Sequence, residues 1–426
     1  MSDSAFQYRN GQLCAEQVKL SELAQTVGTP FYCYSSGAIS GTYTRLTTAL
    51  KDLSAHFFYA VKANGNQAVI RTLAELGAGA DIVSEGEMHR ALAAGIPANK
   101  ILFAGVGKSA EEMSAALEAD ILQFNVESEP ELRLLSQLAC RKDRTARVAL
   151  RINPDVDALT LAGISTGKAE NKFGIDMDLA RDIVTRRNDF PGIALEGLAV
   201  HIGSQLTDLS PYRLAFRRLV ALFKELRAQG LDLKRLDLGG GLGIRYQEEK
   251  PPDLEVYAQI VREETAGLEG VELAFEPGRF LVGNAGILVT RVLYVKESGS
   301  RRFLVLDAAM NDLIRPMLYE AWHDILPVRE ADPAATLAPV DLVGPVCETT
   351  DTFAKQRDLP PVQAGDLLAI CSTGAYGAVM SSTYNCRLPA QEVMVKEGDF
   401  AVVRPRGDYA ALIEQDRLPA WLSAPS

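Results

Sequence analysis

Apolar strand-like runs alternate with amphipathic helix-like runs from residue 39 to about residue 280. Eight short apolar runs predict parallel strands, and they cover 56–61, 80–83, 101–104, 122–126, 147–152, 196–202, 235–238 and 271–276. The stretches between them carry apolar residues at helical spacing and predict helices at 39–53, 67–76, 85–94, 110–118, 129–139, 179–187, 212–229 and 254–268. Three glycines stand where such helices end, namely Gly77, Gly95 and Gly230.

Eight alternating strands and helices predict an α/β fold with a (β/α)8 TIM-like barrel. Barrels of this kind usually need about 250 residues, and residues 35–280 supply that length. An open, doubly wound parallel sheet is the alternative that the same alternation allows.

After Phe280 the pattern changes to short β-rich runs that glycine and proline interrupt. These runs lie at 285–296, 302–306, 338–343, 366–371, 392–395 and 400–403. They predict a second, all-β C-terminal domain with the character of a β-sandwich or barrel. The strand-like residues around Phe31 precede the barrel pattern, so we expect residues 1–34 to join residues 281–426 in this domain.

Composition places the chain among ordinary globular proteins and excludes several partners. Its 426 residues exceed the usual size of one hydrophobic core, which agrees with two domains. The net charge is 44 minus 55, or −11, and this argues against nucleic acid or an anionic membrane as the partner. The N-terminal residues lack a signal pattern, and we expect a cytoplasmic location. The six cysteines form no CxxC pair, so free thiols and no metal site are expected.

Lys62 ends the apolar run 56–61 and is the first candidate for chemistry. Removing water from an ammonium group is costly, so a lysine at such a position usually has a partner or a function. Desolvation lowers the pKa of a lysine, and its free amine can then form an imine with an aldehyde such as pyridoxal 5'-phosphate. A lysine whose stem packs and whose amine reaches water is the structural alternative.

Unusual residues stand at the other strand ends, where the catalytic groups of a barrel gather. They are Asp81, Arg151, His201 with Ser204, Gly239 to Gly243, and Glu276 with Pro277, Gly278 and Arg279. The glycine run can cradle a phosphate or form a simple tight turn. Glu276 needs a cationic partner, either a pyridinium nitrogen or a structural arginine. His201 can stack on a flat ring or be a core histidine, and Asp81 and Arg151 can form one structural ion pair.

Five motifs in a fixed order carry a resemblance to a known family. They are Tyr59-Ala60-Val61-Lys62-Ala63-Asn64, His201-Ile202-Gly203-Ser204-Gln205, Gly239-Gly240-Gly241-Leu242-Gly243, Glu276-Pro277-Gly278-Arg279 and Cys347-Glu348-Thr349-Thr350-Asp351. The chain resembles the fold-type III pyridoxal-phosphate decarboxylases, and most of all the branch that acts on diaminopimelate. One departure lies in the last of these motifs, where a serine or glycine is expected at one of the two positions that Thr349 and Thr350 occupy.

The resemblance implies roles in cofactor binding for the barrel residues. Lys62 would hold pyridoxal 5'-phosphate, His201 would stack on its ring, and Glu276 would keep the ring nitrogen protonated. A protonated ring is the electron sink that a decarboxylation needs. The wider set of cofactor-binding residues comprises Asp81, Arg151, Ser204, Gly239, Gly240, Gly241, Pro277, Gly278, Arg279 and Tyr376.

Residues after the barrel point to the substrate and to a shared site. Arg315 offers a planar fork for a distal carboxylate, although a surface ion pair is its structural alternative. The resemblance implies that Cys347 returns a proton to the α-carbon, as a thiol with a pKa of about 8.5 can do. It also implies a homodimer in which Cys347 reaches Lys62 of the other subunit. The substrate-binding residues expected are Arg279, Arg315, Tyr319, Glu348 and Tyr376.

The expected reaction is removal of the carboxylate at the D-configured centre of meso-2,6-diaminopimelate, which gives L-lysine and carbon dioxide in the last step of lysine biosynthesis. Decarboxylation of ornithine, arginine or carboxynorspermidine is the alternative within this family. A catalytically inactive homologue that binds cofactor or a partner protein is the alternative outside enzymes, and the joint presence of Lys62, His201, Glu276 and Cys347 argues against it.

Overall fold

The computed structural model describes residues 5–157 and 172–422. The chain divides into two compact units, one of residues 38–283 and one that combines residues 1–37 with residues 284–426. Within the described ranges, no helix has both the length and the apolar character that a membrane crossing requires.

Eight parallel strands of the first unit close into a barrel, which confirms the (β/α)8 prediction and makes the doubly wound alternative wrong. The strands are β5 (Ala55–Ala60), β6 (Gly79–Ile82), β7 (Ile101–Phe103), β8 (Gln123–Val126), β9 (Ala146–Ile152), β10 (Ile193–Val200), β11 (Arg235–Asp237) and β12 (Glu272–Phe275). The last strand pairs with the first, Leu273 opposite Ala55, so no sheet edge remains open.

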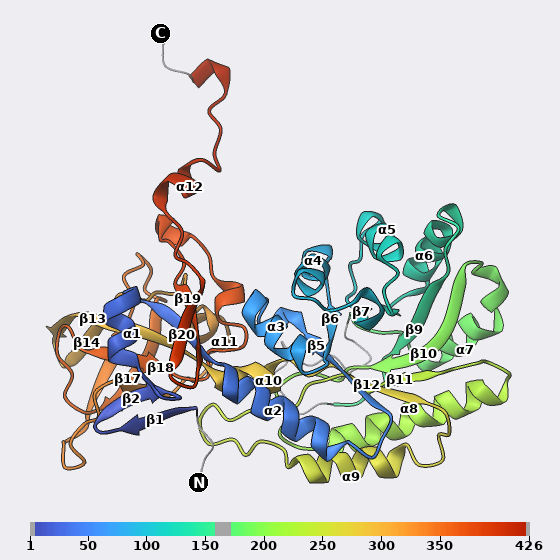
Figure 1. The fold of residues 1–426 in the computed structure, drawn as a ribbon, viewed down its shortest axis with the longest axis horizontal. Coiled ribbons are helices and arrows are strands. Elements are labelled where there is room, and N and C mark those ends of the chain that lie inside the picture. The colour runs from blue at the N-terminus through green and yellow to red at the C-terminus, as the bar shows by residue number, and fades with distance from the viewer. Residues whose placement is uncertain (1–4, 158–171, 423–426) are drawn as a thin grey trace. The chain divides into compact units, whose positions relative to one another are not determined.

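Helices follow the barrel strands and lie outside them (Figure 1). They are α2 (Ser36–Ala49), α3 (Gln67–Glu75), α4 (Glu85–Ala93), α5 (Ala110–Ala119), α6 (Glu129–Arg141), α7 (Met177–Thr185), α8 (Ser210–Ala228), α9 (Leu254–Glu264) and α10 (Arg279–Val282). Polar side chains start several of them. Ser109 caps α5 in a reciprocal capping box with Glu112. Gly77, Gly95 and Gly230 have positive φ, as C-terminal stops require.

The second unit is built mainly of β-strands. Its larger sheet contains β4 (Phe31–Ser35), β13 (Gly286–Ser298), β14 (Arg301–Leu306), β15 (Ile325–Pro327), β16 (Ala338–Val343), β17 (Thr352–Leu359), β18 (Leu367–Ile370), β19 (Gln391–Lys396) and β20 (Asp399–Arg404). A smaller sheet contains β1 (Phe6–Arg9), β2 (Gln12–Ala15) and β3 (Val18–Lys19). The short helices are α1 (Leu20–Val27), α11 (Arg315–Tyr319) and α12 (Tyr409–Ile413).

The N-terminal strand β4 joins this sheet, as predicted. It pairs antiparallel with β13, where Phe31 lies opposite Val289, and parallel with β19, where Phe31 lies opposite Gln391. A buried apolar cluster holds the two sheets and α1 together, and it includes Phe6, Leu13, Leu20, Leu23, Phe31, Ile287, Val289, Val393 and Val395.

Candidate active site

Lys62 lies just beyond β5, in the short 3-10 helix η1 (Val61–Ala63), rather than within the strand itself. Its Nζ atom contacts Asp81 Oδ2 at 3.0 Å. The Lys62 side chain is 36% exposed, whereas Asp81 is fully buried. Lys62 therefore lies at the mouth of the barrel with one carboxylate already beside its amine.

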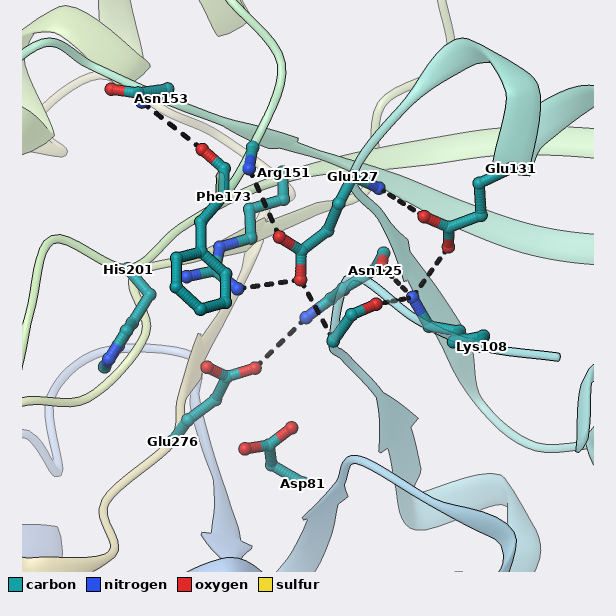
Figure 2. Close-up of polar contacts among 12 residues, drawn as sticks. Asp81, Lys108, Asn125, Glu127, Glu131, Arg151, Asn153, Phe173, His201 and Glu276 are labelled. Carbon is teal, nitrogen blue, oxygen red and sulfur yellow. Dashed lines mark hydrogen bonds and ion pairs between the residues drawn. The ribbon is translucent and has the colours of Figure 1, made fainter. Parts of the chain in front are cut away.

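Asp81 and Arg151 do not pair with each other, so the ion-pair alternative for these two residues is wrong. Arg151 Nη1 instead contacts Glu127 Oε1 at 2.8 Å, and the Arg151 guanidinium lies over the Phe173 ring at 5.0 Å (Figure 2). The second oxygen of Asp81, Oδ1, is buried and has no hydrogen-bond partner among the described residues. An unsatisfied buried carboxylate oxygen is costly, and it marks a place where a ligand can supply a donor.

Glu276 follows β12 directly and is buried. Its Oε1 atom accepts a hydrogen bond from Asn125 Nδ2 at 3.1 Å (Figure 2). Burial raises the pKa of Glu276 well above its ordinary value, and the charges of Asp237 and Asp81 raise it further while Lys62 opposes them. Glu276 consequently holds a proton when no cation lies against it.

His201 follows β10, and its ring stands beside the glycine run. The Gly240 N–H donates to His201 Nδ1 at 3.3 Å, so this nitrogen carries no proton. Burial lowers the pKa of His201 well below 6.5, and the charges of Arg151 and Lys62 act in the same direction. A neutral imidazole ring with a fixed tautomer results, which suits stacking rather than ion pairing.

The glycine run after β11 packs backbone against backbone. Gly239 and Gly241 have φ values of +68° and +103°, which favour glycine. A Cβ atom on Gly240 would lie 2.1 Å from the Glu276 carbonyl oxygen, and one on Gly241 would lie 2.3 Å from the Gly203 carbonyl oxygen. The glycines therefore allow the loops that follow three neighbouring strands to meet at one point.

Arg279 and Ser204 come together at the same end of the barrel. Arg279 Nη2 donates to Ser204 Oγ at 3.1 Å, and Arg279 Nη1 donates to Tyr246 Oη at 2.6 Å. Gly278 precedes Arg279 and packs so closely on β5 that a Cβ atom there would lie 3.0 Å from the Ala60 Cβ atom. Pro277 accepts a backbone hydrogen bond from Ala60.

In the second unit, Arg315 begins α11 and is only 6% exposed. The surface alternative for Arg315 is therefore wrong. Its Nε atom donates to His323 Nε2 at 3.3 Å, and its guanidinium lies 6.0 Å from the centre of the Tyr319 ring. Because His323 Nδ1 contacts the Cys371 carbonyl oxygen at 2.7 Å, His323 is neutral with its proton on Nδ1.

Cys347 and Glu348 lie in an exposed loop, and the segment 384–386 fixes that loop. The Cys347 N–H donates to Asn385 Oδ1 at 3.1 Å, and the Tyr384 hydroxyl donates to Glu348 Oε1 at 2.6 Å. The hydrogen bonds from Tyr384 and Thr350 lower the pKa of Glu348, so it is ionised at neutral pH. Among the described cysteines, Cys347 is a free, exposed thiol.

Tyr376 lies in the loop after β18 and has a φ value of +55°. A tyrosine in this left-handed region is uncommon. The loop is therefore held by its surroundings in a conformation that the residue itself disfavours.

Asn125, Asp237 and Glu127 are site residues that the sequence analysis missed. Asn125 belongs to β8, Asp237 belongs to β11, Glu127 directly follows β8, and all three are buried. Polar side chains within these short barrel strands were the available signal, because buried polar groups in a barrel require partners.

The comparison with protein families agrees with this site. The family model described as "Pyridoxal-dependent decarboxylase, pyridoxal binding domain" matches residues 36–283, which is more than half of the chain. The closed barrel with a lysine at its mouth and a glycine run between strands is thus the cofactor-binding barrel of a pyridoxal-dependent decarboxylase.

Relatives over the whole length define the branch. Diaminopimelate decarboxylase of Zymomonas mobilis is 46% identical over 425 residues, which is 98% of this chain and 99% of the relative. That of Pseudomonas fluorescens is 49% identical over 416 residues, covering 97% and 99%. The crystal structure of diaminopimelate decarboxylase from M. jannaschii in co-complex with L-lysine has a TM-score of 0.92 at 36% identity and covers 99% of both chains. The chain belongs to the diaminopimelate decarboxylase family of pyridoxal-dependent decarboxylases.

Proposed function

We propose that the protein decarboxylates meso-2,6-diaminopimelate at its D-configured centre and releases L-lysine and carbon dioxide. The observation that carries this proposal is the buried Arg315 in a chain whose barrel has the pyridoxal-binding constellation. A guanidinium matches a carboxylate in shape and charge. Diaminopimelate has a carboxylate at the end of the molecule that does not react, whereas ornithine has only an amine there.

The residues at the barrel mouth fit pyridoxal 5'-phosphate. The unsatisfied Asp81 Oδ1 offers an acceptor to a bound cofactor, and the glycine run, which has no side chains, allows a phosphate to approach the backbone. Lys62 supplies the amine for the cofactor aldehyde, and Glu276 faces the position suited to a ring nitrogen. Ser204, Gly239, Gly240, Gly241 and Gly278 are proposed to hold the phosphate, with Pro277, Arg151, Tyr376 and Arg279 around it.

When bound, the cofactor supplies an electron sink for the carbanion that remains after carbon dioxide leaves. The chain's own residues do the rest. The neutral His201 ring is proposed to stack on the cofactor ring without adding charge. Asp81 lies against the Lys62 amine and stabilises its cationic form. The Cys347 thiol is the proposed donor of a proton to the reacting carbon.

Arg279, Arg315, Tyr319, Glu348 and Tyr376 are the proposed substrate-binding residues. Glu348 is an ionised acid held by Tyr384, so it can bind a distal ammonium group. Arg315 can bind the neighbouring carboxylate, since its guanidinium offers two parallel N–H donors and its partner His323 is neutral. Together they would recognise an amino-acid end rather than a bare amine.

The test is carbon dioxide release from diaminopimelate, ornithine, arginine and carboxynorspermidine, measured side by side. We expect diaminopimelate to react with the highest kcat/KM. Arg315→Lys should raise KM for diaminopimelate, because an ammonium group cannot form the two parallel hydrogen bonds of a guanidinium. A preference for ornithine, or no loss in Arg315→Lys, would contradict the substrate assignment.

Lys62→Ala separates an active enzyme from an inactive homologue. The purified protein with added pyridoxal 5'-phosphate should show the visible absorbance of a cofactor joined to lysine, and Lys62→Ala should lack it. Absence of this absorbance from the wild-type protein would favour the homologue that lacks activity.

A homodimer with shared active sites is part of the proposal, and so is a cytoplasmic location. The family resemblance supports a dimer in which Cys347 and Glu348 of one subunit serve Lys62 of the other. Mixing inactive Lys62→Ala with inactive Cys347→Ala should restore activity, because mixed dimers contain one intact site. No recovery after subunit exchange, verified by mass, would contradict shared sites.

A further inference from the structure

Two polar contacts cross the interior of the barrel between strands that are not neighbours. Gln123 and Asn125 lie on β8, and Arg235 and Asp237 lie on β11, each pair on one face because strand side chains alternate. Arg235 Nη1 donates to Gln123 Oε1 at 2.9 Å, and Asn125 Nδ2 donates to Asp237 Oδ2 at 3.1 Å. Strands β9 and β10 separate β8 from β11 in the barrel order, so these bonds span the lumen.

The direction of donation along these side chains is fixed from one end. Arginine can only donate, so Gln123 presents its oxygen to Arg235 and its nitrogen to Asn125. Gln123 Nε2 then donates to Asn125 Oδ1 at 2.7 Å, and the Asn125 nitrogen must face the carboxyl groups. The interior of such barrels is usually filled by branched apolar side chains, so this ordered polar row has a purpose other than packing.

The row ends on two carboxyl groups at once. Asn125 Nδ2 lies 3.1 Å from Asp237 Oδ2 and 3.1 Å from Glu276 Oε1 (the second contact is drawn in Figure 2). Asp237 also accepts the Gly239 N–H at 2.9 Å. Two donors thus point at Asp237 and one at Glu276, which stabilises the ionised form of Asp237 more than that of Glu276.

The charges around Asp237 and Glu276 favour a state in which the two acids share one proton. Burial raises the pKa of both Glu276 and Asp237. The charges of Asp237 of β11 and Asp81 of β6 raise the pKa of Glu276 further, and Lys62 of η1 lowers it. The Asn125 amide nitrogen lies 3.1 Å from an oxygen of each acid, and two neighbouring buried carboxylates cannot both ionise at low cost. Two donors to Asp237 against one to Glu276 favour Glu276 as the acid that holds the proton.

We propose that Asp237 is a positioning residue that acts through Glu276, so that the two acids, clamped by the Asn125 amide, store one proton for the cofactor ring nitrogen. The inference rests on the proposed function, because it needs a pyridine ring beside Glu276. Glu276 would hold the ring nitrogen of bound pyridoxal 5'-phosphate, and the acid pair would supply the proton on that nitrogen and the negative charge that balances it. No proton has to be taken from water.

The test is infrared spectroscopy of the full-length chain freed of cofactor, at about pH 7, in the C=O stretching region of protonated carboxyl groups. The band that disappears in Glu276→Gln belongs to the shared proton. We expect the band of Asp237→Asn to disappear at a lower pH than the band of the wild type, since Glu276 then loses one of its two negative neighbours while burial and Asp81 remain. Asp253→Asn is the matched control, because Asp253 caps α9 outside this row and asparagine caps as well. The control should keep the band.

The cofactor gives a second measurement. Asp237→Asn should bind pyridoxal 5'-phosphate roughly tenfold more weakly, the equivalent of one pKa unit at the ring nitrogen. Absence of the Glu276 band from the wild-type chain, or the same pH dependence of the band in Asp237→Asn as in the wild type, would overturn the proposal. The wild-type comparison with Glu276→Gln tests the stored proton even if Asp237→Asn does not fold. A normal band in a chain that releases no carbon dioxide would refute the proposed function and leave the acid pair standing.

Discussion

Replacing Gly240 with alanine tests whether the glycine run is a tightly packed junction or a replaceable turn. The added Cβ atom would lie 2.1 Å from the Glu276 carbonyl oxygen and 2.9 Å from the Glu276 carbonyl carbon. Ordinary contacts between such atoms are about 3.5–4.0 Å, so the backbone segments at Gly240 and Glu276 must separate by more than about 1 Å. The opposing atoms are backbone, and rotation of a side chain cannot relieve the clash.

The expected cost follows from this geometry. Inserting one carbon into a closely packed region costs typically about 1–3 kcal/mol, and a clash with backbone belongs at the upper end of that range. Moving the Glu276 backbone also displaces the carboxyl group proposed to face the ring nitrogen. We therefore expect a loss of stability together with weaker binding of pyridoxal 5'-phosphate.

The assay is urea unfolding of Gly240→Ala beside Gly107→Ala, with cofactor affinity measured on both. Gly107 belongs to the same barrel unit, and a Cβ atom there meets nothing within 4 Å. The control should change stability by less than about 1 kcal/mol. Equal unfolding midpoints for the two variants would refute the argument that the loops after β11 and β12 meet without space for a methyl group.

Two further predictions concern the proton donor and the dependence of stability on pH. Cys347→Ala should lower turnover by roughly two to four decades, the usual contribution of a positioned acid, with cofactor absorbance unchanged. Cys140→Ala, which changes an exposed free cysteine of α6, should retain turnover. Equal losses in the two variants would remove Cys347 from the mechanism. Burial raises the pKa of Glu87 from 4.5 to about 7. Between these two pKa values the folded chain binds more protons than the unfolded chain. The free energy of unfolding therefore falls as pH rises from 4.5 to about 7. Glu87→Gln should flatten this fall between about pH 5 and about pH 8 in urea unfolding, and an unchanged slope would contradict the raised pKa.

The eight barrel strands were predictable because each is a short apolar run with a helix after it. The strand β17 was not, since its sequence alternates poorly and exposes Lys355, Gln356 and Arg357 or leaves them half-buried. Gln356 has a φ value of +48°, and the register shifts on the paired strand β16. An edge strand with such an irregularity carries little hydrophobic periodicity to read.

The site residues were predictable by type, but their partners were not. Lys62 stood out as a cation after an apolar strand, whereas nothing local indicates that Asp81, rather than another acid, lies beside its amine. Arg151 was singled out correctly for its position, and its partner Glu127 was missed. Which side chains pair in a barrel depends on which strand ends meet across its mouth. That arrangement depends on all eight strands together, and the local sequence around one residue does not indicate it.

The buried charged groups at the barrel mouth are of two kinds, those that use all their hydrogen-bonding capacity and those that do not. Lys108 uses its amine on Glu131, on the Gly105 carbonyl and on the Asn125 carbonyl, which are the three bonds that an ammonium group can donate. This fixes the backbone of Asn125, whose side-chain nitrogen contacts Asp237 and Glu276; Figure 2 shows the bonds of Lys108 and the contact with Glu276. Asp81 keeps an oxygen that no donor among residues 5–157 and 172–422 contacts. The three bonds of Lys108 stabilise the geometry of the site, whereas the second oxygen of Asp81 can still bind a ligand. Removing Lys108 would therefore loosen the hold of Asn125 on Asp237 and Glu276, the pair proposed to share a proton.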